Sequence, residues 1–288
     1  MTKKILSILK TLILVILPFL VGIPISKYSP YVETNSFKTY IIIWMAISIA
    51  FTSIVLVLSK YYVQSFGSLF IGGLLLFLLV SPIAGIIGLA AAPDLSLKLL
   101  EHPEREHLRY IFLFIAALLF GVFFLLLFKS HSLKVSNVTR WLAIVIFILA
   151  FAEFIWEFTH HYLYPEALKE WINQGKNAEA FSKSYDSINI GVSGRLIQFS
   201  LLIWLSVRLY KLRHIKTWSS VITIVFSVIG IASAFVIYAT QMNIPKGFEI
   251  LFLFFIPGIP FLLLYWLGVG LLTQFNFSSN ISGTGRCV

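Results

Sequence analysis

The chain has 288 residues, of which 59% are hydrophobic and only 12% are charged. This balance excludes a water-soluble globular domain, because about a quarter of the residues in such a domain carry a charge. The formal net charge is +10, but a chain this apolar is expected to have the lipid bilayer as its main partner, and no nucleic acid. A single cysteine, Cys287, excludes an internal disulfide.

Eight apolar stretches follow one another along the chain, each close to the roughly 20 residues that a helix needs to cross a membrane. Helices are the consistent prediction, because unpaired backbone groups are not tolerated in lipid and the stretches are too long for barrel strands. The stretches are residues 5–25, 39–58, 66–92, 110–128, 141–158, 188–209, 221–239 and 250–272. The predicted fold is an all-α polytopic membrane helix bundle, a single domain over residues 1–272, with a disordered polar tail at 273–288.

The charged residues predict the orientation of this bundle. If the N-terminus is cytoplasmic, none of the 12 Asp and Glu residues falls in an inner loop, so the inner face is purely basic. Such a face agrees with the positive-inside bias and suits the anionic lipids of a cytoplasmic leaflet. We therefore expect a multi-pass protein of a bacterial cytoplasmic membrane, with both termini inside and anionic lipids at its basic face.

Helix-breaking residues gather in the third and eighth stretches. SPIAGIIGLAAA contains Pro82, and FFIPGIP contains Pro257 and Pro260. Each proline removes an intrahelical hydrogen bond, so kinks are expected at both places. Broken helices form the binding sites of many transporters, although proline and glycine are also common in membrane helices that have no such role.

Two predicted outer loops, residues 93–109 and 159–187, are long enough to fold into a lid over the outer ends of the bundle. In the second loop, PEALKEWINQG begins with a proline and ends with Gly175, while Leu168, Trp171 and Ile172 share one helical face. This pattern predicts a short amphipathic helix on the membrane surface. In the first loop, Pro103 is placed to start a helical turn.

The fifth stretch ends in FAEFIWEFTHH, which is unusual for a membrane helix. At about 100° per residue, Glu153, Glu157, His160 and His161 share one side of the helix. A carboxylate this deep needs a partner, because a lone charge in hydrocarbon costs several kcal/mol.

Arg195 is the expected partner of Glu153, because it lies at a similar depth on the next, antiparallel helix. Gln198 is placed to complete the hydrogen bonding. The preceding small residues Gly191, Ser193 and Gly194 should let another helix come close.

Four interpretations of this cluster remain open. The ion pair could only fix the register of two helices. It could line an outward-open cavity, where a glutamate exchanges protons during transporter-like, proton-coupled translocation of a small solute. His160 and His161 with His102 or His107 could bind Zn²⁺ or another divalent metal in a membrane enzyme acting at the outer face. Finally, the outer loops could bind a protein partner without catalysis.

Overall fold

The computed structural model describes residues 5–6, 8–16, 42, 46, 50, 97–101, 103–129, 133, 135–185, 188–255 and 258–282. Within these residues every regular element is helical and there is no strand, as the sequence predicts. The second and third predicted helices lie outside the described residues apart from positions 42, 46 and 50, and so does the predicted kink at Pro82. The count of eight spans and the side of the termini therefore stay predictions.

Ten helical elements lie between residues 97 and 282 in the described part of the chain. They are η1 (Leu97–Glu101), α4 (Pro103–Lys129), α5 (Asn137–Tyr162), α6 (Tyr164–Asn173), η2 (Ala178–Ala180), α7 (Phe181–Tyr185), α8 (Ile188–Lys211), α9 (Thr217–Thr240), α10 (Ile250–Phe255) and α11 (Gly258–Ser282). Three of them, α5, α8 and α9, are long and apolar enough to cross a membrane. The described part of the chain is therefore all-helical and has the features of a membrane protein.

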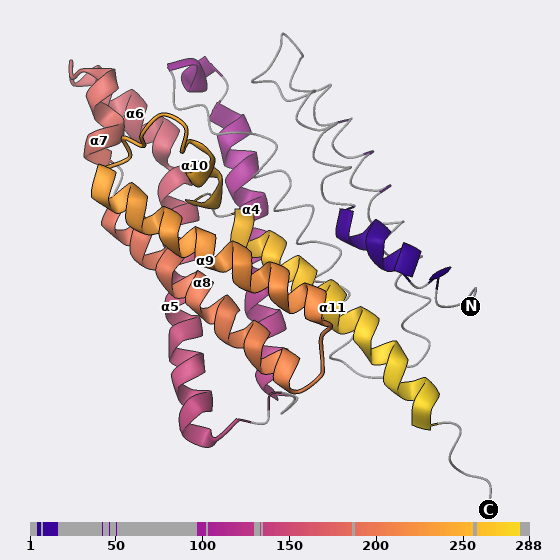
Figure 1. Ribbon diagram of the computed structural model, residues 1–288. Coiled ribbons are helices and arrows are strands. Elements are labelled where there is room, and N and C mark those ends of the chain that lie inside the picture. Colours follow the sequence, from indigo (N-terminus) through magenta and orange to yellow (C-terminus); the bar gives the residue numbers. More distant parts are fainter. Residues whose placement is uncertain are drawn as a thin grey trace, which may run out of the picture.

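The helices α5, α8 and α9 lie side by side, with α8 in contact with both of the others (Figure 1). Helix α4 packs on α5, and α11 contacts both α9 and α8. The short elements α6, α7 and α10 gather where α5 ends and α8 begins, which we call the α6 end of the bundle. The turn between α8 and α9 lies at the opposite end, which we call the turn end.

Helix α11 also contacts the first apolar stretch, where residues 8–16 are helical. The Tyr265 hydroxyl donates to the carbonyl of Leu14 at 2.6 Å, and the Trp266 indole donates to the carbonyl of Val15 at 3.1 Å. These side chains satisfy their polar groups inside an apolar bundle, where an unpaired donor would be costly. The two ends of the described chain are thus joined within one bundle.

Several helices are longer than their apolar stretches. Ser136 caps α5 by accepting a hydrogen bond from the backbone of Thr139 at 3.3 Å, so the helix begins before the apolar run. Helix α4 begins at Pro103, since proline suits the first turn and the acidic residues in that turn favour the positive end of the helix dipole. Much of the predicted loop 93–109 is therefore helix.

The predicted disordered tail is partly wrong, because α11 continues to Ser282. A polar segment can extend an existing helix, since adding a residue to a helix is far easier than nucleating a new one. Residues 273–282 thus belong to α11. The remaining residues of the predicted tail lie outside the described residues.

The predicted short helix in the second outer loop is present as α6, with a proline in its first turn and Gly175 at a φ of +74° after its end. Its expected apolar face is covered by protein, which corrects the expectation that this face lies on the membrane. Leu168 is buried in a cluster with Leu99 of η1 and Phe181 of α7. The two predicted outer loops therefore pack onto each other at the α6 end.

Small residues along α9 allow close packing of its neighbours. A Cβ on Gly230 would overlap the Phe199 ring of α8, and a Cβ on Gly270 of α11 would overlap the Ser219 side chain. Ser219 also donates to the carbonyl of Trp266 at 3.2 Å. Close backbone approach and hydrogen bonds together hold α8, α9 and α11 in position.

Candidate functional site: a buried charge cluster

Arg195, in the first half of α8, is completely buried. Its guanidinium donates from Nη1 to Oε2 of Glu153 at 3.4 Å and from Nη2 to Oε2 of Glu157 at 2.5 Å. The expected contact between Arg195 and Glu153 is therefore present. Glu157, one turn later on α5, makes the shorter of the two ion pairs.

Gln198 closes a ring of hydrogen bonds around these charges. Its carbonyl oxygen accepts from Nη1 of Arg195 at 2.6 Å, and its amide donates to Oε2 of Glu153. The same amide reaches the carbonyl of Ala150 at 3.4 Å. Because a side-chain amide both donates and accepts, Gln198 can bridge a cation and an anion at the same time.

The third side of the guanidinium faces a break between two helices. Nε of Arg195 donates to the carbonyl of Phe255 at 2.7 Å, and Phe255 is the last residue of α10. In a continuous helix this carbonyl would accept a hydrogen bond from the amide four residues later. The helix ends here, so the arginine supplies the missing donor. This contact was not predicted from the sequence, although the FFIPGIP motif was a signal for it.

The two prolines of that motif have different outcomes. Pro257 lies outside the described residues. Pro260 is buried in the first turn of α11, where no intrahelical donor is needed from its nitrogen. The predicted interruption of the eighth stretch is present as the separation of α10 from α11.

Glycine at position 194 brings α8 against the Glu153 carboxyl. A Cβ built on Gly194 would overlap that carboxyl group, so no side chain fits there without displacement. A Cβ on Gly191 would lie 3.3 Å from the Phe255 ring, which is a tight but milder contact. Ser193 is exposed, so the expectation that it also admits a neighbouring helix is wrong. Its side chain points away from the neighbouring helices because residues two positions apart, such as Ser193 and Gly191, lie on different faces of a helix.

The cluster holds two carboxyl groups and one guanidinium. Side-chain exposure is 0% for Arg195, 7% for Glu153 and 11% for Glu157. The aromatic rings of Phe154 and Phe255 lie 5.8 and 5.7 Å from the guanidinium carbon. Oε1 of Glu153 is buried without a hydrogen-bond partner among the residues that the structure describes. If both carboxyl groups are ionised, one negative charge is in excess in an apolar environment.

The two histidines after the glutamates lie in the last turn of α5, with their rings edge to face at 5.8 Å between centroids, but each stacks on a different neighbour. The ring of His160 stacks on Tyr185 of α7, with 4.0 Å between ring centroids, and its Nε2 lies 3.1 Å from the Tyr185 carbonyl oxygen. The ring of His161 stacks instead on Tyr110 of α4 at 5.3 Å. A helical wheel places both on one side, but their 100° separation directs them to different neighbours.

His107, from the first predicted outer loop, does not join them. His107 lies on α4, with Nε2 2.9 Å from a carboxyl oxygen of Glu166 on α6, while His102 is outside the described residues. The described part of the chain contains no group of three His, Cys, Asp or Glu side chains arranged to bind a metal ion. The geometry of these imidazoles therefore gives the metal interpretation no support.

A second buried ion pair was missed by the sequence analysis. Nη1 of Arg109 lies 3.4 Å from Oε2 of Glu106, and both side chains are buried in the first turns of α4. Their i,i+3 spacing in EREHLRY was the available signal. The pair was not predicted because this segment was assigned to a loop. An i,i+3 spacing places two side chains next to each other only when the segment is a helix.

No family model, curated protein or solved structure matches this chain.

Proposed function

We propose that this chain is a multi-pass protein of the bacterial cytoplasmic membrane that couples protonation of the Arg195, Glu153 and Glu157 cluster to the translocation of a small solute. The observation that supports this proposal is the pairing of two buried carboxyl groups with a single guanidinium. Ionisable side chains inside membrane bundles are rare and commonly belong to proton relays or substrate pathways.

The charge balance favours a bound proton. One excess negative charge in a low-dielectric site is costly, and a proton on either carboxyl group would neutralise the cluster. Glu153 has an oxygen without a donor among the described residues, so it has an open position for that proton. Glu157 is the more exposed carboxyl group and lies closer to the α6 end of α5. A proton arriving from that end would therefore meet Glu157 first.

The contact between Arg195 and α10 provides a route from protonation to movement. Neutralising one carboxyl group weakens its attraction for the guanidinium, which also holds the Phe255 carbonyl. The α10 segment lies at a helix interruption, and interrupted helices commonly surround the solute site of membrane transporters. Release or recapture of this carbonyl would let α10 shift relative to α8.

The competing interpretation is a fixed ion network that holds the helix register. It is favoured by the complete burial of Arg195 and by donors engaged on all three of its nitrogens. The two interpretations differ in one measurable respect. A proton-coupling cluster must gain and lose a proton in the folded protein, whereas a fixed network keeps one protonation state.

Infrared difference spectroscopy of the purified protein, recorded between acidic and alkaline buffers, tests for this proton. The wild-type protein should show the carbonyl band of a buried carboxylic acid that titrates reversibly. The band should be lost or displaced in Glu153→Gln, because a glutamine keeps the size of the side chain but cannot bind the proton. A band unchanged in both Glu153→Gln and Glu157→Gln would contradict the proposal.

Translocation is tested in proteoliposomes that contain a pH-sensitive dye and carry an imposed solute gradient. Amino acids, sugars and organic anions are supplied in turn, and at least one class should move protons with wild-type protein. The same solute should move none with Glu153→Gln, provided that circular dichroism shows an unchanged helix content. Lys246→Gln, an exposed change in the α9–α10 connection, serves as the control that should retain activity. Failure of all three classes to move protons would contradict the proposal.

A further inference from the structure

The turn between α8 and α9, at the end of the bundle opposite the charge cluster, forms an open cavity of about 640 Å³, and Tyr210, Arg213 and Thr217 of its lining are exposed to solvent. This volume is within the range of roughly 300–1,000 Å³ found for small-molecule sites. The lining residues combine cationic, aromatic and hydroxyl side chains: Tyr210, Lys211, Arg213, Ile215, Lys216, Thr217 and Trp218. Neither α8, α9 nor the turn between them contains an Asp or Glu. The chemistry of the lining therefore favours an anion.

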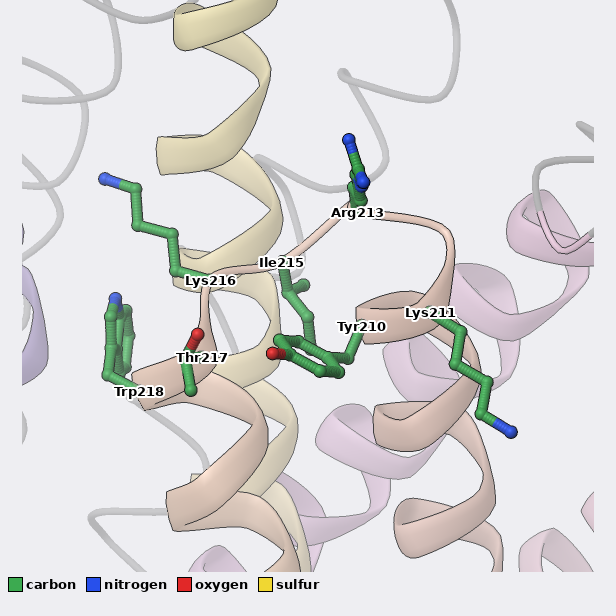
Figure 2. A pocket seen from close by; sticks show the side chains of 7 residues that line it. All are labelled: Tyr210, Lys211, Arg213, Ile215, Lys216, Thr217 and Trp218. Carbon is green, nitrogen blue, oxygen red and sulfur yellow. The ribbon is translucent and has the colours of Figure 1, made fainter.

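The polar groups of the cavity lie between the end of one helix and the beginning of the next. Figure 2 shows the hydroxyl groups of Tyr210 and Thr217 pointing toward each other across this space, with Ile215 between the two helices. Arg213 stands at the top of the turn, and Lys216 extends beside Trp218. The ends of the Arg213 and Lys216 side chains point outward from this space in the figure, so each would have to turn inward to meet an anion held between the two hydroxyl groups.

The beginning of α9 adds a second anion-binding element. Lys216 is the N-cap residue, and no side chain caps the helix there. The first amides of an α-helix have no intrahelical acceptor, and the helix dipole makes this end positive. An anion in the cavity would take the place of the missing cap.

The backbone of the turn places Arg213 just after the end of α8. Its φ is +58°, in the left-handed region, where glycine is the usual residue at the end of a helix. A side chain in this conformation is unfavourable for the fold. Two other arginines at this end have evident structural contacts: Arg208 donates to the carbonyl of Leu133 at 2.7 Å, and Arg140 donates to that of Phe128 at 3.2 Å. The amide of His214 donates to the carbonyl of Leu209 at 2.9 Å and that of Arg213 to the carbonyl of Tyr210 at 2.8 Å, so this conformation closes the end of α8 and leaves the Arg213 side chain exposed at the turn.

We propose that this cavity binds the phosphate group of an anionic phospholipid. Phosphate oxygens would accept hydrogen bonds from the two hydroxyl groups and the first amides of α9, with Arg213 and Lys216 neutralising their charge. A phospholipid is the favoured source because α8 and α9 are both candidate membrane spans, so their connecting turn lies at the level of the lipid headgroups. Tyr210 and Trp218 are also the residue types that gather at this level.

Partial burial of Lys216 is consistent with such a ligand. Removal from water lowers the pKa of its ammonium group, because burial disfavours the charged form. A phosphate beside it would favour the charged form and so offset part of this effect. This inference does not depend on proton coupling at the Arg195 cluster.

The test uses the purified full chain in detergent, with phosphatidylglycerol and phosphatidylcholine of identical acyl chains supplied at equal mole fraction. Native mass spectrometry counts the lipids that remain bound. The wild-type protein should retain phosphatidylglycerol preferentially. The double variant R213Q/K216Q should bind it roughly tenfold to thirtyfold more weakly, the loss expected for two cations at an anionic headgroup. K216R should bind as the wild type does.

Two further variants show whether a loss of binding reflects the loss of a contact or misfolding of the protein. Y210F and T217V remove only the hydroxyl groups, and each should weaken binding severalfold while circular dichroism stays unchanged. K246Q makes the same change of charge as K216Q, but near the opposite end of α9, and should bind as the wild type does. Equal retention by the wild type and the double variant, or an equal loss in K246Q, would overturn the proposal.

A phosphate group could come from a lipid headgroup or from free inorganic phosphate, and a binding experiment with inorganic phosphate distinguishes the two. It is added alone to the delipidated protein, and binding is followed by the quenching of tryptophan fluorescence. A lipid site should bind inorganic phosphate weakly and phosphatidylglycerol well, because the glycerol and acyl groups add contacts. Tight binding of inorganic phosphate without any preference for phosphatidylglycerol would overturn the assignment to a lipid.

Discussion

Gly194 of α8 lies directly against the Glu153 carboxyl of α5, so closely that a single added carbon would overlap it. This contact determines how near the two helices approach, and therefore whether Arg195, the next residue along α8, can reach both glutamates. The buried ion pairs thus depend on a residue that carries no charge. Close approach of membrane helices at small residues is a general means of association in lipid, where the hydrophobic effect contributes little.

Replacing Gly194 with alanine should destabilise the protein. The new methyl group must displace the Glu153 carboxyl or separate α5 from α8, at a cost of about 1–3 kcal/mol. Gly191→Ala is the matched control on the same helix, because its Cβ meets only the far end of the Phe255 ring. Its effect should stay within about 1 kcal/mol, since alanine is also the better helix former. Unfolding in detergent, followed by circular dichroism, compares the two; a larger loss in Gly191→Ala would contradict the packing argument.

Removing the guanidinium should be more damaging than removing the whole set of charges. Arg195→Ala leaves two buried carboxyl groups without their cation and should lower the free energy of unfolding by about 3–5 kcal/mol. Combining Arg195→Met with Glu153→Gln and Glu157→Gln removes every charge and should recover much of this loss. The same unfolding measurement tests both variants. A triple variant less stable than Arg195→Ala would mean that the charges are not balanced against one another.

Two buried serines of α9 should respond in opposite ways to alanine. Ser233 donates to the carbonyl of Leu251 in α10 at 2.6 Å, so its replacement should cost about 1 kcal/mol. Ser227 has no hydrogen-bond partner among the described residues, although its oxygen is buried. Ser227→Ala should therefore be neutral or stabilising by up to about 1 kcal/mol. Thermal unfolding of both variants in the same detergent gives the comparison, and a greater loss in Ser227→Ala would refute it.

Packing at the α6 end should depend on Leu99 and not on its neighbour Leu97. Leu99 of η1 is only 2% exposed, whereas Leu97 in the same element is 57% exposed. Leu99→Ala should leave a cavity costing about 2–4 kcal/mol and expose the segment from α6 to α7 to local unfolding. Hydrogen exchange of the backbone amides in residues 164–185 should be faster in this variant alone. Equal exchange in both variants would show that η1 does not hold α6 in place.

The pairing of a buried glutamate with a buried arginine could be predicted from the sequence because its cause is local and energetic. A charge near the middle of a long apolar stretch needs a partner at the same depth, and depth follows from counting residues along each helix. The closer contact with Glu157 and the bond to the Phe255 carbonyl could not be predicted in this way. They depend on the rotation of each helix about its axis, which packing determines.

The histidines illustrate the same limit. A helical wheel places His160 and His161 on the same side as the glutamates, but it contains no information about which neighbour occupies each sector. The neighbours are Tyr185 of α7 and Tyr110 of α4, and each histidine stacks on one of them. A metal site would have required both rings to turn toward a common point.

The sequence by itself determined the class of this protein, since hydropathy over about 20 residues is a property of each segment alone and lipid permits only helices for such segments. It also determined the purely basic character of the predicted inner loops. Only the tertiary structure decided that α6 packs on η1, that Arg195 holds α10, and that the turn between α8 and α9 forms an open cavity. These features join segments distant in the chain or fix the angle between helices. Side-chain packing determines these relationships, and the hydropathy of a segment does not predict them.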